Sequence, residues 1–323
     1  MRRAAWGVVG VLAFGALAAP WVSPQDPWVQ FADRSYAPPT RVRLLAADGW
    51  HAPFIYRQVL VDRVSRRYAD DVSVRVPLRW LADGRLVSVD AAAGPLLWLG
   101  ADSLGRDIWS RVWHGARLSI GVAMAGALGA LVVGVLLGAL AGAIRGWIDI
   151  AVTSIADFVI VLPAVYLVLV LRSLMPVVLD APVVFLLLTV LFATAGWPHV
   201  ARGVRAIVAT ERRRDYAEAA LAIGAGRLRL LGHLVAAAYG FLRVEFVLLV
   251  PALLIAESTI SFLGLGFPEP QPSWGLMLKE ASSVSAMQLA PWTLSPAVLL
   301  FVFVLALQQL AGGQSVDTAE PPR

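Results

Sequence analysis

The sequence predicts an all-α integral membrane protein with six transmembrane helices. Of its 323 residues, 59% are hydrophobic, and the mean hydropathy of +0.72 is too high for a soluble domain of this size. Several uncharged runs approach or exceed the roughly 20 residues that cross a bilayer as a helix. Cysteine is absent, which excludes disulfides and thiolate metal sites.

Six apolar runs are candidate spans. Four of them carry no Asp, Glu, Lys or Arg, and these are residues 6–22, 118–144, 181–201 and 291–310. The other two, 150–171 and 241–266, contain the acids Asp157 and Glu257. A charge deep in a bilayer is costly and usually faces protein or a water-filled cavity. Asp157 and Glu257 are therefore candidates for the transport pathway, with a structural contact between helices as the alternative.

The distribution of arginine predicts the orientation. Arg2 and Arg3 precede the first apolar run, so the N-terminus should remain cytoplasmic. Six spans return the C-terminus to the cytoplasm and place residues 201–240, where arginines outnumber acids, on the same side. Residues 23–98 then lie outside, and segments longer than about 60 residues largely escape the charge rule. A cleavable signal peptide ending near Pro20 is the alternative for the first run, but that run is longer than the usual apolar core of about 7–15 residues.

The outer segment 23–98 differs in composition from the spans. Short β-branched pieces alternate with turn signals at Asp48-Gly49 and Asp83-Gly84. A small β-rich cap and an irregular decoration both fit this pattern. No catalytic or ligand-binding motif stands out in it.

The segment 99–122 predicts an amphipathic helix that lies at the membrane interface and leads into the second span. Trp109 and Trp113 would sit at headgroup depth, and the opposite face carries arginines, including Arg106 and Arg111. Asp107 and Arg111 are spaced for an i,i+4 ion pair.

Within the second span, small residues recur at Gly134, Gly138 and Gly142. This small-xxx-small spacing allows two helices to approach closely. The partner helix is either in the same chain or in a second membrane subunit, and the sequence leaves both open.

Catalytic motifs are absent from the sequence. Lys279, the only lysine, is followed by Glu280, so no phosphate-binding loop of the G-x-x-x-x-G-K-[ST] type exists. The four histidines form no H-E-x-x-H metal motif, and neither a metal nor another cofactor is expected. Two rivals to a binding or transport role remain open at this point. An intramembrane serine hydrolase would use Ser258 or Ser261 with His199, and a secondary transporter would couple ions through Asp157 and Glu257. The excess of arginine suits membrane loops, so no nucleic-acid partner is expected.

The stretch "RRRDYAEAALAIGAGRLR", residues 212–229, is charged although apolar spans flank it. Strong helix formers run from Asp215, a candidate cap, to Ile223, and Gly224 suits a left-handed stop. A second amphipathic piece covers 227–235. The small side chains at Ala217, Ala219, Ala220 and Ala222 would let this helix lie in a groove of a partner protein. A merely solvated loop is the alternative.

Four motifs resemble those of one transporter family. The segment "EAALAIGAG" is similar to the EAA motif of binding-protein-dependent ABC importer permeases. Three other segments resemble signatures of the dipeptide/oligopeptide branch, C-type subunit, and they occur in that family's order. They are "LGADSLGRDIWSRVWHGARLSI" from residue 99, "DFVIVLP" from Asp157 to Pro163 and "ESTISFLGLGFPEPQPSWGLML" from Glu257.

The resemblance implies a type I ABC importer permease fold with an extracytoplasmic insertion, in the bacterial cytoplasmic (inner) membrane. It implies an anchor (1–22), an insertion (23–98), a permease transmembrane domain (99–312) with the coupling loop 201–240, and a tail (313–323). The implied partners are a B-type permease subunit, two cytoplasmic ATPase subunits that hydrolyse ATP, and an extracytoplasmic substrate-binding protein. The implied ATPase-docking residues are Asp215, Tyr216, Glu218, Ala219, Ala220 and Gly224. The resemblance leaves the solute open between peptides, nickel chelates and other small molecules.

Overall fold

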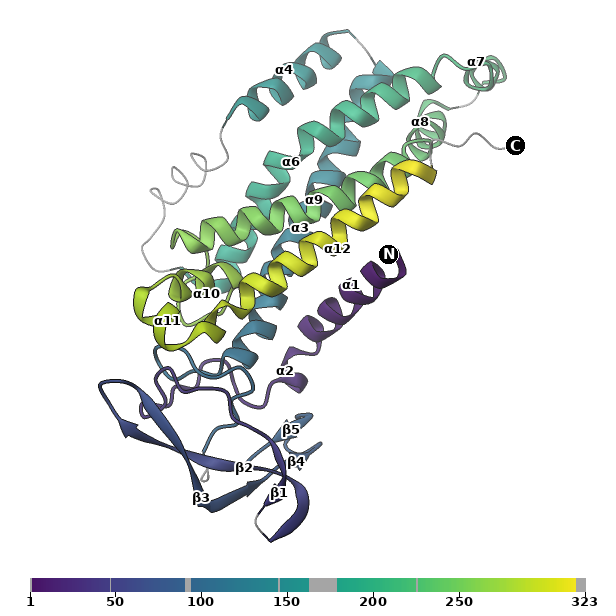
Figure 1. The fold of residues 1–323 in the computed structure, drawn as a ribbon. Coiled ribbons are helices and arrows are strands. Elements are labelled where there is room, and N and C mark those ends of the chain that lie inside the picture. Colours follow the sequence, from purple (N-terminus) through teal and green to yellow (C-terminus); the bar gives the residue numbers. More distant parts are fainter. Residues whose placement is uncertain are drawn as a thin grey trace. The chain divides into compact units, whose positions relative to one another are not determined.

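The computed structural model describes residues 2–46, 48–90, 94–144, 146–162, 179–224 and 226–317 (Figure 1). The chain divides into two compact units. The first unit comprises Met1–Trp6, Ile120–Glu257 and Val304–Arg323, and the second unit comprises Gly7–Ser119 and Ser258–Phe303. The prediction of six spans falls partly on residues 163–178, which lie outside the described residues, as does Pro163 of the third-span motif.

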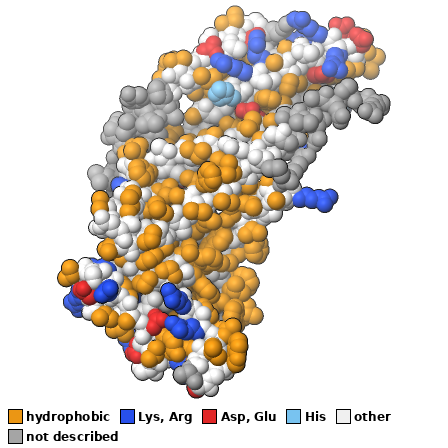
Figure 2. Space-filling view, viewed as in Figure 1, with side chains coloured by type: hydrophobic (Ala, Val, Ile, Leu, Met, Phe, Trp, Pro, Cys, Tyr) orange, Lys and Arg blue, Asp and Glu red, His pale blue; other side chains and the backbone are white. Residues whose placement is uncertain are grey.

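Long apolar helices dominate the chain. Among the described residues, four helical stretches are long and apolar enough to cross a membrane. They belong to α3 (Ile108–Ile144), α6 (Ala181–Glu211), α9 (Tyr239–Phe262) and α12 (Ser295–Asp317), the last preceded by the 3-10 turn η2 (Pro291–Leu294). The other two predicted spans coincide with shorter helices, α1 (Arg2–Leu17), which continues into α2 (Ala19–Val22), and α4 (Trp147–Val161). Figure 2 shows hydrophobic side chains spread along the surface of the helices, as a lipid-facing protein requires.

In the first unit, the glycine ladder of α3 packs against α6 of the same chain. A Cβ atom placed on Gly138 would lie 2.5 Å from the carbonyl oxygen of Ala201, and one on Gly142 would lie 2.8 Å from that of Arg205. Both separations are too short for any side chain, so glycine is what permits the contact. The sequence left open whether the partner helix belongs to this chain or to a second membrane subunit. In the structure the partner is α6 of the same chain. On another side of α6, Trp197 packs with Ala156 of α4.

In the second unit, the segment after α2 forms a β-structure. The strands β1 (Arg43–Ala46), β2 (Gly49–Asp62) and β3 (Arg67–Pro77) form an antiparallel sheet in the order β1-β2-β3, and β4 (Arg79–Trp80) pairs with β5 (Val87–Ser88). The predicted turns are confirmed, because Gly49 and Gly84 have φ angles of 119° and 70°. The β-rich alternative for this segment is therefore correct, and "all-α" describes the membrane helices alone.

Also in the second unit, a short helix packs against one end of α3 and one end of α9. α10 (Trp274–Ala281) begins after Ser273, whose hydroxyl accepts a hydrogen bond from the backbone N–H of Leu276 at 3.2 Å. Trp274 is fully buried, and its indole Nε1 donates to the carbonyl of Val112 in α3 at 3.0 Å. On the other side, Gly275 lies so close to Ser258 and Ser261 of α9 that no side chain would fit. The helix α11 (Val284–Leu289) follows it.

Candidate functional site

The charged stretch forms a helical hairpin in the first unit. α7 (Asp215–Ala222) and α8 (Arg227–Ala236) flank a turn in which Gly224 has a φ angle of 83°. The predicted left-handed stop at Gly224 is confirmed. Asp215 is the first residue of α7 rather than a residue before it, and its carboxylate in the first turn suits the positive end of the helix dipole.

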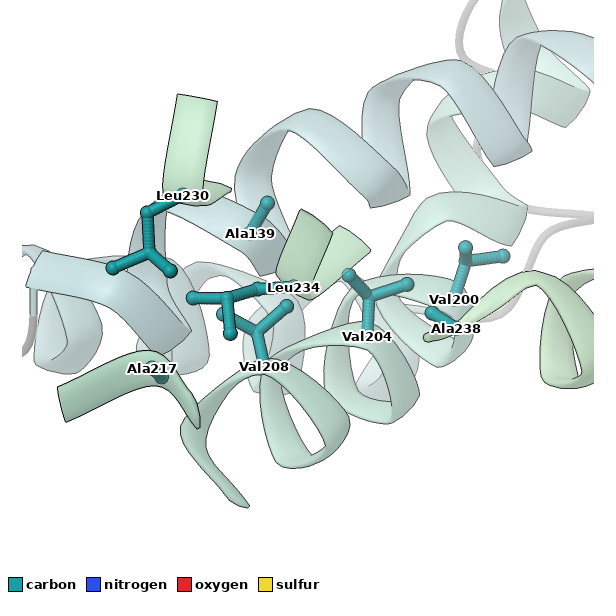
Figure 3. Close-up of a cluster of buried hydrophobic side chains, with 8 residues drawn as sticks. All are labelled: Ala139, Val200, Val204, Val208, Ala217, Leu230, Leu234 and Ala238. Carbon is teal, nitrogen blue, oxygen red and sulfur yellow. The ribbon is translucent and has the colours of Figure 1, made fainter. Parts of the chain in front are cut away.

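One face of the hairpin is buried on the membrane helices. Ala217 of α7 is fully buried with Leu230 and Leu234 of α8, against Val204 and Val208 of α6 (Figure 3). Ala139 of α3, Val200 of α6 and Ala238 complete this cluster, which we call the hairpin base. The prediction that Ala217 faces a partner protein is wrong. The small side chain of Ala217 serves close packing on α6, and the half-buried Ala220 also packs on the hairpin base.

The opposite face of the hairpin is exposed. Glu218, Ala219 and Gly224 are open, Tyr216 is 46% exposed and Ile223 is 87% exposed. Charged side chains gather in the same region, at the upper right of Figure 2. The sequence prediction missed Ile223, although its position directly before the turn glycine marks it as the tip of the hairpin. Five of the predicted docking residues thus share one accessible surface, and Ala220 lies at its edge.

The hairpin is tied to the helices at its entrance. Arg212 donates a hydrogen bond to the carbonyl of Ala143 in the last turn of α3, where a helix leaves carbonyls unpaired. The hydroxyl of Tyr216 donates to the Glu211 carboxylate at 2.9 Å, and the guanidinium of Arg214 contacts the same carboxylate at 3.0 Å. These contacts orient the start of α7 relative to the end of α6.

The two candidate pathway acids have different surroundings. Asp157 of α4 forms an ion pair with Arg202 of α6, and Asp149 pairs with Arg205 one turn further along, with 2.7 Å between Nη2 and Oδ2. These contacts join α4 to α6 and support the structural alternative for Asp157. Glu257 of α9 is fully buried, so its carboxyl group is surrounded by protein in the single chain.

Of the predicted interfacial helix over residues 99–122, only the part from Ile108 onward is helical, and it is the start of α3. α3 starts only at Ile108 and runs on into the span, and residues 99–107 precede it as a loop. Arg106 and Arg111, predicted on a solvent-facing side, are 1% and 0% exposed. The reason is that carboxylates from the same loop and from a distant segment surround them. Arg106 contacts Asp102 at 2.6 Å, Glu269 at 2.6 Å and Glu280 at 2.7 Å.

Asp107 has a different role from the predicted ion pair with Arg111. Its carboxylate accepts hydrogen bonds from the backbone N–H of Ser110 at 3.0 Å and from the Ser110 hydroxyl at 2.5 Å. It therefore caps the first turn of α3. Arg111 instead contacts Glu280 at 3.1 Å. Burial raises the pKa of Asp107 to about 7, against the opposing effect of these hydrogen bonds.

These observations define the class of the protein. It is an integral membrane protein whose apolar helices carry, at one end, a folded helical hairpin with an exposed face. Within the described residues, no group of three or more potential ligands is placed to hold a metal ion.

Comparison with known proteins identifies the family. Residues 134–312 match the family of binding-protein-dependent transport system inner membrane components. The chain belongs to this family. It is a permease subunit of an ABC importer in the inner membrane and not an enzyme, which removes both the serine hydrolase and the ion-coupled transporter as alternatives.

Several relatives carry the names of peptide transport permeases. The chain is 35% identical over 210 residues to the oligopeptide transport system permease protein OppC of Bacillus subtilis (strain 168). The aligned region covers 65% of this chain and 66% of that protein. It is 37% identical over 184 residues to the dipeptide permease DppC of the same organism, covering 57% of this chain and 56% of the relative. The di/tripeptide permease DppC of Pseudomonas aeruginosa (strain UCBPP-PA14) is 30% identical over 305 residues, or 94% and 82% of the two chains. These matches confirm the resemblance to C-type subunits.

Proposed function

We propose that the chain is the C-type subunit of an importer for peptides or a similar small solute, and that its hairpin docks on a cytoplasmic ATPase subunit. The proposed docking surface comprises Asp215, Tyr216, Glu218, Ala219, Ala220 and Gly224, with Ile223 added. The observation that carries the proposal is the two-sided hairpin, which is anchored on one face and open on the other. The names of the relatives, which include a glutathione permease of Pectobacterium atrosepticum, support peptide-like solutes.

The proposed mechanism uses the hairpin base. Closure of two ATPase subunits on ATP would displace α7, and the buried contacts of Ala217 and Leu234 with α6 would pass the displacement to the membrane helices. A second, B-type permease would complete the pathway, and an extracytoplasmic binding protein would deliver the solute. The pathway would alternate between a state open to the inside and a state open to the outside. For ATP to shift the balance between these two states, the free energy of the docking contacts must differ between them.

The proposed topology has six spans with both termini in the cytoplasm. In this arrangement, residues 1–22 form an anchor, 23–98 an outer insertion, 99–312 the transport domain with the cytoplasmic loop 201–240, and 313–323 a tail. Activity reporters fused at Asp70, in β3, and at Glu218, in α7, should report opposite sides of the membrane, because an odd number of spans separates them. The same side for both fusions would contradict this topology.

A direct test of the proposed function is copurification. The isolated chain should show no nucleotide binding, since its sequence lacks a phosphate-binding loop. Coexpressed with the ATPase and B-type subunits, it should copurify with both and yield ATP hydrolysis that a loaded binding protein stimulates. Nucleotide affinity of the isolated chain, or failure to retain an ATPase subunit, would refute the proposal.

A further inference from the structure

In the first unit, α6 and α9 meet at two glycines of α6. A Cβ atom on Gly196 would lie 3.6 Å from Cδ2 of Leu249, and one on Gly203 would overlap the ring of Phe241. From the first contact to the second, the chain advances by seven residues along α6 and goes back by eight along α9. Both intervals are about two turns of an α-helix. The two helices therefore run antiparallel between these contacts, along a line that we call the α6–α9 seam (residues 196–203 and 241–249).

Two polar side chains lie midway along the α6–α9 seam. His199 is three residues from one glycine contact of α6 and four from the other, and Glu245 is four residues from each contact of α9. Residues three or four apart share one face of a helix, so His199 and Glu245 adjoin the seam from opposite sides. They are close enough to interact electrostatically. His199 is exposed in the chain, and Glu245 is half-buried.

The surroundings of the pair are those of a membrane span. Large apolar side chains are exposed elsewhere on the same helices, among them Leu186 and Val190 of α6 and Leu248 of α9. Such side chains suit a surface that faces lipid. An acid within a span, in contrast, almost always faces protein or a water-filled cavity. We therefore expect the accessible side of the pair to adjoin water or another subunit in the assembled transporter.

No ion pair among the described residues joins Glu245 to an arginine. Arg202 and Arg205 of α6 form ion pairs with aspartates of α4. The guanidinium of Arg243 lies over the ring of Tyr239, 5.8 Å from its centroid. The imidazole opposite Glu245 adds no charge when it is neutral. An ionised carboxylate therefore makes this part of the seam negative, and a negative site attracts cations and repels anions.

We propose that the pair of His199 and Glu245 lines the solute pathway, and that Glu245 is a specificity-determining residue. Its carboxylate favours solutes that carry a positively charged group, such as the free amino end of a peptide. This inference deepens the proposed function and rests on it.

Cysteine labelling tests the location of the pair, because the chain contains no cysteine. His199→Cys is coexpressed with the B-type and ATPase subunits, and its labelling by water-soluble thiol reagents is measured in open membranes. Leu136→Cys is the control, because Leu136 of α3 is 59% exposed. It also lies at about the same depth, since Gly138 packs on Ala201 two residues further along both helices. We expect the cysteine at position 199 to react and the one at 136 to remain unlabelled.

Two reagents of similar size and opposite charge test the role of Glu245. They are the ethyltrimethylammonium and ethylsulfonate methanethiosulfonates, and each rate is divided by the rate for a small thiol in solution. At position 199 the cationic reagent should be favoured by about threefold or more, as one nearby carboxylate at physiological ionic strength predicts. Adding Glu245→Gln should remove this preference, whereas Glu245→Asp, which keeps the charge, should retain it. Ala195→Cys, one turn earlier on the same face of α6, should report the same preference and replaces His199→Cys if that variant does not accumulate.

Three results would overturn the inference. Equal labelling at positions 199 and 136 would place the pair at the membrane surface or in lipid. Labelling at 199 in the chain alone that disappears on coexpression would place it in a contact with the B-type subunit. A charge preference that persists in Glu245→Gln would remove the role of Glu245. Copurification of the ATPase subunit is measured on the same membranes, so that its failure, which refutes the proposed function, is distinguished from these results.

Discussion

Gly224→Val and Glu218→Lys are each expected to leave membrane abundance near that of the unaltered protein and to reduce ATP-driven uptake by about tenfold or more. A tenfold loss corresponds to about 1.4 kcal/mol of docking free energy. Both residues lie on the exposed face of the hairpin, away from the hairpin base. Insertion into the membrane should therefore proceed normally, while contact with the ATPase is weakened.

The two substitutions act for different physical reasons. The φ angle of 83° at Gly224 lies in the left-handed region, where a residue with a Cβ loses roughly 1–2 kcal/mol. A Cβ at Gly224 meets no atom within 4 Å, so strain in the turn and added bulk on the docking surface are the only effects. Glu218→Lys reverses a charge on an exposed turn of α7 without changing the backbone.

Gly226 supplies a matched control for Gly224. It lies in the same turn and is exposed, and a Cβ there also meets no atom within 4 Å. Its φ angle, however, is −63°, which any residue adopts. Gly226→Val should therefore retain uptake and ATPase copurification. If Gly224→Val and Glu218→Lys retain both as well, the exposed face of α7 is not the docking surface.

Gly138→Ala is expected to lower the stability of the protein markedly. The added Cβ would lie 2.5 Å from the carbonyl oxygen of Ala201 and 2.9 Å from its Cα atom. Backbone atoms cannot move aside as a flexible side chain can, so α3 and α6 must separate. Overpacking of this kind lowers stability by about 1–3 kcal/mol, although alanine is intrinsically the better helix former. Thermal unfolding of the detergent-purified protein should show a lower midpoint.

Gly121, on the same helix, is the control for this prediction. A Cβ there would lie 3.4 Å from the ring of Phe185, which is an ordinary contact. Gly121→Ala should therefore unfold at or above the temperature of the unaltered protein. Equal midpoints for Gly138→Ala and Gly121→Ala would show that the tight α3–α6 contact is absent from the protein in solution.

The hairpin could be predicted from the sequence because its signals are local. Helix formers from Asp215 onward and a glycine at position 224 are sufficient to define a helix and its stop. Which alanines face inward could not be predicted, because the burial of Ala217 depends on Val208 of α6 and Leu230 of α8. The same reason explains the glycine ladder, whose spacing predicts a close helix partner without specifying which one.

The charged cluster in the second unit could not be derived from the pattern around it. Arg106 and Arg111 have the spacing of a polar helical face, and such a face is normally exposed. Their burial is compensated by Glu269 and Glu280, which lie more than 160 residues further along the chain. A rule based on neighbouring positions, such as the i,i+4 pairing of Asp107 with Arg111, cannot identify partners that are distant in the sequence.

The length of α6 has a mechanical consequence. Its 31 residues, at a rise of about 1.5 Å each, make a rod of about 46 Å, whereas the hydrocarbon core of a bilayer is about 30 Å thick. The hairpin packs against the C-terminal part of α6, around Val204 and Val208. A force applied to the hairpin therefore exerts a torque on α6, and Pro198 inside this helix is the point at which it would bend, because proline removes a hydrogen bond within the helix. The expected response is a tilt of the part of α6 that follows Pro198, which carries the hairpin contacts at Val204 and Val208.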